Sequence, residues 1–348
     1  CILVTGAAGS IGSGLVQEIA RLEPKKIILL DQAESPLYDL QFELNQHFEN
    51  LAYEIMVGDI CNEERMRHLF ETFRPDIIFH AAAYKHVPLM EKNAYEAVKV
   101  NILGTQTLAD LAVDHGVDKF IMVSTDKAVN PTNVMGATKR FAEMYTQSLN
   151  GKEGIRTKFI ATRFGNVLGS SGSVIPLFKK QIERGGPVTV THPEITRYFM
   201  TIPEACELVL EAATMGEGGE VFVFDMGESV KIVNLAKKMI TLSGLRVDRD
   251  IEIKFTGLRP GEKLYEELLI GDNPLPTSHS RIMKAHEDFL PWGDLQAKLT
   301  DLTLALDIND VPLIRNLLKD LVPGYQPDGE VVDWVWLAQQ SKQIEIES

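Results

Sequence analysis

Short apolar runs alternate with longer amphipathic stretches along the first half of the chain. Runs typical of buried strands lie at residues 1–4, 26–30, 53–60, 76–83 and 120–123. The stretches between them are long enough for helices, as at residues 14–21 and 96–114. Strands that alternate with helices in this way are typical of a parallel sheet covered on both faces. The pattern therefore predicts an α/β fold with a Rossmann-type, doubly wound parallel sheet.

A different pattern begins near residue 168. A Gly/Ser loop leads into a helix there, and from residue 230 onward the chain is mainly helical. Between these parts, a helical stretch and a short apolar run return to the earlier pattern. We therefore predict two domains. Residues 1–167, with return segments at about 200–227, form the Rossmann domain, and residues 168–199 and 228–348 form a smaller, mainly helical domain for the substrate.

A glycine-rich turn follows the first predicted strand. Glycines at this position allow a tight turn and let backbone N–H groups approach a pyrophosphate at a helix N-terminus. The second strand ends in Asp31, 19 residues after Gly12. An acidic residue about 20 positions beyond the glycines binds the adenosine ribose hydroxyls and repels a 2′-phosphate, which favours NAD over NADP. The turn residues that we expect to bind this cofactor are Gly6, Gly9, Ser10, Ile11 and Gly12.

Composition narrows the range of partners. The net charge is −14, from 35 basic and 49 acidic residues, which argues against nucleic acid as a partner. The three cysteines form no CxxC pair and no cluster with histidine, so we predict no metal site. No stretch approaches the roughly 20 apolar residues that span a bilayer, so we expect no direct membrane contact from this segment.

The strongest chemical signal is the stretch at residues 124–139, directly after the strand at 120–123. Side chains at the carboxyl end of such a strand point into the crevice where open α/β sheets bind ligands. Asp126 and Lys127 place a carboxylate beside an amine at this point, with Thr125 before them. The three residues are therefore candidates for proton transfer.

This stretch resembles the catalytic segment of extended short-chain dehydrogenase/reductase proteins. More narrowly, it resembles the UDP-N-acetylglucosamine 4,6-dehydratases of the CapD-like polysaccharide-biosynthesis family. Those families usually have a Tyr four residues before the Lys that matches Lys139, whereas this chain has Met135. The resemblance implies NAD-dependent dehydration of UDP-N-acetylglucosamine to a UDP-4-keto-6-deoxy-N-acetylhexosamine, for bacterial surface glycan biosynthesis. The subgroup that lacks the Tyr retains, by the same resemblance, the configuration at C5.

The resemblance also implies a role for each residue of the segment. Asp126 is the acid toward the C6 hydroxyl, and Lys127 is the base at C5, which requires that its pKa is lowered so that it is neutral when it acts. Thr125 binds the C4 hydroxyl, and Lys139 binds the nicotinamide ribose. Met135 cannot take a proton, so the C4 proton goes to Asp126, to Asp126 through Thr125, or to water.

Further ligands are carried over from the family by position. Beyond the glycine turn, the expected cofactor contacts are Asp31, Asp59, Ile60, Ala81, Ala82, Asn101 and Lys139. The expected substrate contacts are Lys85, Asn166, Ser173, Val174, Arg197, Arg259 and Glu262. Among these, Arg259 lies in a Pro/Gly turn, and its planar guanidinium suits a diphosphate.

Assembly and location are also expectations from the resemblance. Helices near 96–114 and 136–149 match the pair that builds a four-helix interface in many superfamily dimers, so we expect a homo-oligomer. Some family members carry membrane helices ahead of this domain. The resemblance therefore implies a cytoplasmic domain of a longer protein anchored in the bacterial inner membrane.

Two other functions compete with dehydration. A UDP-sugar 4-epimerase would need the Tyr base and no chemistry at C5, so Met135 and Lys127 count against it. A catalytically inactive NAD-binding sensor would be consistent with loss of the Tyr. The retained Thr125, Asp126 and Lys127, together with Arg259, count against a sensor, which has no use for a diphosphate ligand.

Overall fold

The computed structural model describes residues 1–268, 274–285, 287, 289–327 and 330–347. Within these residues, nine strands form one sheet in the order β14-β15-β11-β6-β5-β4-β1-β2-β3. The strands are β1 (Ile2–Thr5), β2 (Ile27–Asp31), β3 (Tyr53–Val57), β4 (Ile77–His80), β5 (Lys119–Val123), β6 (Lys158–Arg163), β11 (Val221–Phe224), β14 (Leu275–Pro276) and β15 (Ile282–Ala285). Strands β3 to β11 in this order pair in parallel, and β14 and β15 add an antiparallel edge. The predicted Rossmann-type fold is confirmed.

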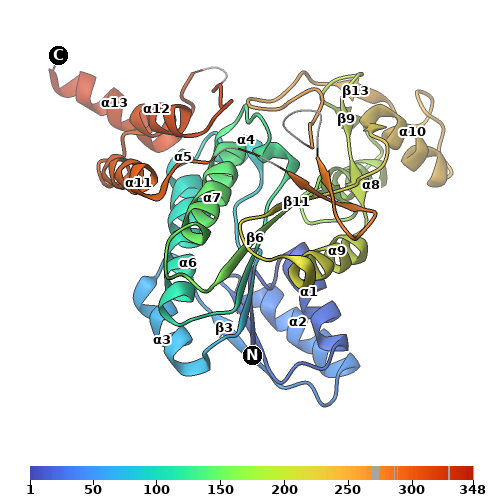
Figure 1. The fold of residues 1–348 in the computed structure, drawn as a ribbon. Helices are drawn as coiled ribbons and strands as arrows, with labels where there is room; N and C mark the ends of the chain where they lie inside the picture. The colour runs from blue at the N-terminus through green and yellow to red at the C-terminus, as the bar shows by residue number, and fades with distance from the viewer. Residues whose placement is uncertain (269–273, 286, 288, 328–329, 348) are drawn as a thin grey trace.

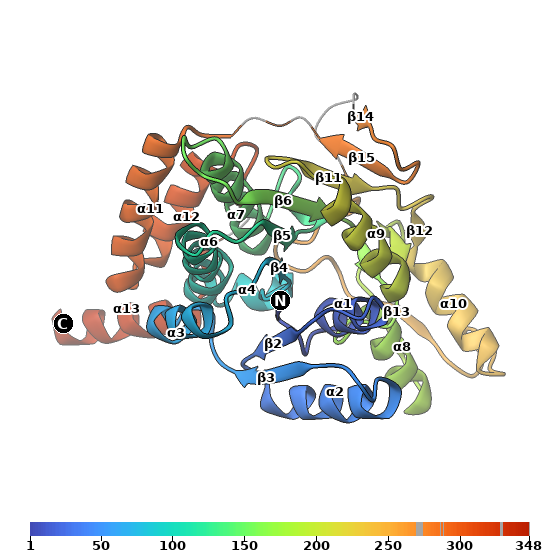
Figure 2. The same cartoon turned by 60° about the horizontal axis from the view of Figure 1, so that its bottom comes forward.

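Helices cover both faces of the sheet (Figure 2). Because successive strand residues point to opposite faces, Leu3 and Ile28 lie in one hydrophobic core and Val4 and Leu29 in the other. The core of Val4 is closed by α1 (Ser10–Arg21), α2 (Glu34–His47) and α9 (Ile202–Met215). The core of Leu3 is closed by α3 (Glu63–Phe73), α6 (Thr105–Asp114) and α7 (Val134–Asn150). The result is a three-layer α/β/α domain.

A smaller unit lies beyond the carboxyl ends of the central strands and has its own core (Figure 1). Its helices α8 (Val174–Glu183) and α10 (Ile232–Leu242) bury Phe178 and Ile240 against each other. Short strands complete it: β8 (Val188–Val190) pairs with β13 (Ile253–Phe255), and β9 (Thr196–Arg197) pairs with β12 (Val230–Lys231). Another short pair, β7 (Asn166–Val167) with β10 (Phe199–Met200), connects it to the sheet.

The C-terminal helices do not belong to this smaller unit, contrary to the predicted boundary at residues 228–348. Helices α11 (Trp292–Asp307) and α12 (Val311–Leu321) pack on α7 and on α5 (Ala94–Val98), where Figure 1 shows them on the far side from α8 and α10. Their apolar residues, such as Leu295 and Leu318, join the core of Leu3. A last helix, α13 (Trp334–Glu347), follows them. The sequence periodicity showed that these helices bury one face but not which unit receives it.

The same helices change the expected interface between copies of the chain. All residues of α7 from Val134 to Leu149 are buried within the single chain, because α11 and α12 cover the helix. The prediction that the helices at 96–114 and 136–149 meet a second copy is therefore wrong for α7. Oligomer formation itself stays a prediction. In the described residues, no helix is both long and apolar enough to cross a membrane.

Candidate active site

The glycine-rich turn connects β1 to α1 and leaves no room for a side chain at Gly6 or Gly12. A Cβ on Gly12 would lie 1.9 Å from the carbonyl oxygen of Gly6, and one on Gly6 would lie 2.5 Å from the backbone nitrogen of Ala82. Gly6 also has a φ of +68°, which L side chains rarely adopt. Helix α1 begins at Ser10 without a side-chain cap, so its first N–H groups remain for a ligand. The geometry therefore fits a dinucleotide diphosphate.

Two acidic residues lie at the carboxyl ends of β2 and β3, beside this turn: Asp31 is the last residue of β2, and Asp59 follows β3. Asp31 accepts hydrogen bonds from the backbone N–H groups of Ala8 at 3.0 Å and Ala33 at 2.9 Å, one on each carboxylate oxygen. Each oxygen keeps a second lone pair, so ribose hydroxyls can still donate to it. Asp59 accepts from the N–H of Cys61 at 2.9 Å, and the neighbouring Ile60 is buried. Asp31 and Asp59 thus each accept a hydrogen bond from the backbone of the loop that follows their strand.

Asn101, a predicted cofactor contact, makes hydrogen bonds within the protein. It lies in the π-helix η1 (Lys99–Gly104) and is fully buried. Its amide donates to the carbonyl of Tyr84 at 3.0 Å and to Thr138 Oγ1 at 3.0 Å, and it accepts from the N–H of Tyr84 at 2.8 Å. Both of its donors are thus used within the protein. The hydrogen bonds of Asn101 therefore tie the loop after β4 to α7.

The three candidate catalytic residues form one hydrogen-bonded group after β5. Thr125 caps the short 3-10 helix η2 (Asp126–Ala128). Asp126 is fully buried, and its Oδ1 accepts from Lys127 Nζ at 2.9 Å and from Thr125 Oγ1 at 2.9 Å. Its other oxygen, Oδ2, is buried with no hydrogen-bond partner among the described residues. The group therefore keeps one buried carboxylate oxygen without a hydrogen bond, which is unusual for a buried polar atom.

Lys127 is held as an ammonium, contrary to the neutral amine that we expected. Its Nζ donates to Asp126 and to Asn166 Oδ1 at 3.3 Å, and Glu266 Oε1 lies 3.6 Å away. Burial disfavours the charged amine, but the carboxylates of Asp126 and Glu266 outweigh it and raise the pKa of Lys127 above its usual value. The sequence did not reveal Glu266, because it lies in a different domain and no local pattern marks it.

Lys139 and Met135 are both buried side chains of α7. Burial lowers the pKa of Lys139 to about 8, although the nearby carboxylate of Glu143 opposes this effect. Met135 is buried in the core that α7 shares with the sheet. Arg140, which directly follows Lys139, and Glu143, one turn further along α7, form a buried ion-pair network with Arg163 and Glu287. This network ties α7 to β6 and to the segment after β15.

Two predicted substrate ligands make internal contacts instead. Arg197 donates to the backbone carbonyls of Lys263 at 2.9 Å and Thr196 at 2.7 Å, so it holds the turn at residues 257–264 in place. Glu262 accepts from Arg259 Nη2 at 2.9 Å and from the N–H of Arg259 at 3.1 Å. We therefore assign Arg197 and Glu262 to supporting the turn. Arg259 remains about half exposed and available to a ligand.

The Gly/Ser loop before α8 brings the remaining predicted ligands together. The N–H of Ser171 donates to Ser10 Oγ at 3.1 Å, next to the glycine-rich turn. Ser173 precedes Val174, the first residue of α8, and its buried hydroxyl has no partner among the described residues. Lys85 lies on the loop after β4, and the residue is exposed overall. Partial burial of its amine lowers its pKa, and the charge of the nearby Lys127 lowers it further. Residues from both domains thus meet at the carboxyl ends of β1, β4 and β5.

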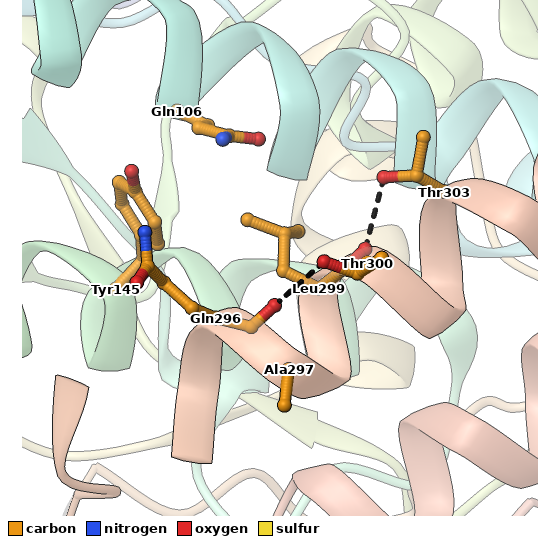
Figure 3. Close-up of a pocket in the computed structure, with 7 residues that line it drawn as sticks. All are labelled: Gln106, Tyr145, Gln296, Ala297, Leu299, Thr300 and Thr303. Atoms are coloured by element: carbon orange, nitrogen blue, oxygen red, sulfur yellow. Dashed lines mark hydrogen bonds between the residues drawn. The ribbon is translucent and has the colours of Figure 1, made fainter. Parts of the chain in front are cut away.

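A cavity elsewhere in the molecule contains none of the predicted site residues. It has a volume of about 350 Å³ and lies between α6, α7 and α11 (Figure 3). Its lining residues are Gln106, Tyr145, Gln296, Ala297, Leu299, Thr300 and Thr303. Because none of them is charged, the cavity lacks the cations that would bind a nucleotide phosphate.

A family model described as "Polysaccharide biosynthesis protein" matches residues 2–287. The chain belongs to this family. The match covers the sheet, the site and the smaller domain and ends before α11. The predicted CapD-like membership within the extended short-chain dehydrogenase/reductase superfamily is therefore confirmed.

Three curated relatives illustrate the range of the family. The capsular polysaccharide biosynthesis protein CapD of Staphylococcus aureus is 58% identical over 77% of this chain, but the match covers 45% of CapD. The chain thus spans about half the length of that relative. A UDP-N-acetylglucosamine 4,6-dehydratase (inverting) of Campylobacter jejuni is 36% identical, over 78% of both chains. A UDP-glucose 4-epimerase of Rickettsia conorii is 34% identical, over 77% of both chains.

Two solved structures share the fold of this chain. Pen from Bacillus thuringiensis superimposes with a TM-score of 0.76 at 34% identity, covering 83% of this chain and 90% of Pen. The dTDP-glucose 4,6-dehydratase DesIV from Streptomyces venezuelae, solved with NAD, superimposes with a TM-score of 0.68 at 23% identity, covering 77% of this chain and 88% of DesIV. The second likeness concerns the fold alone.

Proposed function

We propose that this protein is an NAD-dependent 4,6-dehydratase that converts UDP-N-acetylglucosamine to a UDP-4-keto-6-deoxy-N-acetylhexosamine. The observation that carries this proposal is the hydrogen-bonded pair of Asp126 and Lys127 at the end of β5. Dehydration needs an acid and a base side by side, near C6 and C5 of the sugar. An epimerase has no use for this pair. The likeness to a 4,6-dehydratase supports the same reaction.

Bound NAD would accept the C4 hydride and return it to C6. The chain's own residues handle the protons. Thr125 Oγ1 donates to Asp126 Oδ1 at 2.9 Å, so a C4 hydroxyl that donates to Thr125 can pass its proton to Asp126. Asp126 then protonates the leaving C6 hydroxyl, and Lys127 removes the C5 proton. Met135 takes no part, because a thioether carries no proton.

The same arrangement leads us to propose retention at C5. Lys127 is the one residue that acts as a base at C5 in this proposal, and it holds the C5 proton on one face of the sugar. A base that returns this proton to the same face restores the original configuration. The relative from Campylobacter jejuni carries the word "inverting" in its name, so NMR analysis of the product in deuterated water is the deciding measurement. Coupling constants of an inverted C5 would exclude the single-base pathway.

The cofactor proposal rests on Asp31. Its two oxygens flank the glycine-rich turn, where a 2′-phosphate would meet a fixed negative charge. We expect purified protein to carry NAD and to bind NADP poorly, measured by release of bound nucleotide and by titration. Equal affinity for the two nucleotides would contradict the role of Asp31.

The proposed setting is bacterial surface glycan biosynthesis, in line with the name of CapD. We further propose that the domain works as a homo-oligomer on the cytoplasmic side of the inner membrane, within a longer anchored protein. The deciding test of the activity is incubation with UDP-N-acetylglucosamine followed by mass spectrometry. Loss of one water supports dehydration. A product of unchanged mass but altered C4 configuration would establish epimerisation, and no product with bound NAD would favour a sensor.

A further inference from the structure

A second carboxylate, Glu266, faces Lys127 from the segment after the turn at 257–264. Its side chain is 3% exposed, and its Oε1 lies 3.6 Å from Lys127 Nζ and 3.6 Å from Arg197 Nε. The other oxygen, Oε2, is buried and has no hydrogen-bond partner in the described part of the chain. A buried polar atom without a hydrogen-bond partner is costly, so this arrangement calls for a functional reason.

The proposed reaction requires a proton acceptor at this place. Lys127 must be neutral to remove the C5 proton, yet two carboxylates hold it as an ammonium in the free protein. Asp126 cannot take the ammonium proton, because it receives the C4 proton and keeps it for the C6 hydroxyl. Glu266 is the other carboxylate in contact with Lys127 among the described residues.

We propose that Glu266 takes a proton from the Lys127 ammonium and thereby makes Lys127 the base that acts at C5. The inference rests on the proposed dehydratase function and makes Glu266 a positioning residue that acts through Lys127. Once the C4 proton neutralises Asp126, one of the two charges that hold the ammonium is gone. A neutral amine beside a carboxylic acid then costs less to bury than the remaining ion pair. The unpaired Oε2 leaves the Glu266 carboxyl free to hold a proton.

Every proton has a donor and an acceptor in this sequence. The C4 hydroxyl proton passes through Thr125 to Asp126 and leaves with the C6 hydroxyl as water. The Lys127 proton moves to Glu266, and the C5 proton moves to Lys127 and back to C5. Glu266 then returns its proton to Lys127. The hydride from C4 ends at C6, so the net change is the loss of one water.

Two other cations influence the transfer. Lys85 lies near enough to Lys127 for the two to repel, which favours a neutral Lys127. Arg197 Nε lies 3.6 Å from Glu266 Oε1, and the charge of Arg197 also acts to lower the pKa of Lys127. Asn166 accepts from Lys127 and is neutral in every state. Both cations therefore disfavour the Lys127 ammonium, and the loss of charge at Asp126 weakens its stabilisation further.

The test is Glu266→Gln, which keeps the shape of the side chain but cannot take the proton. In single turnovers with UDP-N-acetylglucosamine, reduced nicotinamide should form at close to the wild-type rate. Exchange of the C5 proton with deuterated water should fall by ~10²–10⁴-fold at pH 7. It should then rise about tenfold per pH unit, because Lys127 must lose its proton to solvent, whereas the wild-type rate stays flat over the same range.

Two further variants separate a proton role from a structural one. Glu266→Asp keeps a carboxylate and should recover part of the rate at neutral pH. Glu267→Gln changes the exposed neighbour that contacts Lys263 and Asn130, and it should keep the wild-type pH profile. Melting temperatures confirm that each variant is folded.

The outcomes distinguish this inference from the proposed function. A pH-independent loss in Glu266→Gln would overturn the inference in favour of a structural role. Faster C5 exchange at pH 7 would also overturn it, because Glu266 would then only stabilise the ammonium. If Glu266→Gln is too unstable to assay, Glu266→Asp becomes the test. A C5 exchange rate in Glu266→Asp that rises tenfold per pH unit would show that its carboxylate does not take the proton, and would overturn the inference as well. A wild-type protein that releases no dehydrated sugar would instead refute the proposed function.

Discussion

Acid is expected to destabilise the protein through one buried histidine, His80, on β4. The Nδ1 atom of His80 lies 2.8 Å from Thr5 Oγ1, and its Nε2 atom lies 2.9 Å from Thr105 Oγ1. Because the Thr105 hydroxyl donates to the carbonyl of Asn101 at 2.8 Å, it must accept from Nε2–H. Nδ1 then accepts from Thr5. Both ring nitrogens are therefore satisfied in the neutral ring.

The magnitude follows from the two pKa values of His80. Burial lowers its pKa to about 3 in the folded protein, and the nearby Lys139 ammonium adds to this effect. In the unfolded chain the pKa returns to about 6.5. The unfolded state thus binds one more proton between these values, so the free energy of unfolding decreases as the pH falls below about 6.5. From pH 7 to pH 5, His80 alone should remove about 2 kcal/mol.

The assay is urea unfolding of wild type and His80→Asn at pH 7 and pH 5. At pH 7 the variant should be less stable by about 1–3 kcal/mol, because a buried hydroxyl loses its partner. Its further loss on moving to pH 5 should be smaller than that of wild type by about 2 kcal/mol. His68→Asn, at an exposed position of α3, is the matched control and should keep the wild-type pH dependence. Equal pH dependence in wild type and His80→Asn would refute the buried neutral ring.

Three further changes probe the site and its support. Gly12→Ala places a Cβ 1.9 Å from the carbonyl oxygen of Gly6 and should abolish nucleotide retention, measured as bound NAD after purification; full retention would contradict the turn geometry. Lys127→Ala should lose dehydration by ~10²–10⁴-fold while reduced nicotinamide still accumulates on the enzyme; normal product release would remove Lys127 from the mechanism. Arg163→Met leaves two buried glutamates with less compensation and should cost ~3–5 kcal/mol in unfolding free energy, whereas a loss below the error of the measurement would show that Arg140 suffices.

The sequence by itself determined the parts of the protein that depend on local order along the chain. Alternating apolar runs and amphipathic stretches specify a parallel sheet, since each run must be buried on both faces. The glycine turn follows from its spacing, because only Gly fits where a Cβ would meet the carbonyl of Gly6. Asp126 and Lys127 are neighbours in the chain, so their meeting at the end of β5 needed no tertiary information.

Only the tertiary structure decided which distant groups meet. Glu266 reaches Lys127 from another domain, and this contact together with Asp126 holds the amine as an ammonium rather than the free base. Arg197 is a cation in the sequence, but the fold directs it to backbone carbonyls of the turn. Helices α11 and α12 show an apolar face in the sequence, yet only packing reveals that α7 receives it. Hydrophobic periodicity indicates that one face of a helix is buried. Which element packs on that face, and whether a side chain is protonated, depend on the neighbours that the fold brings together.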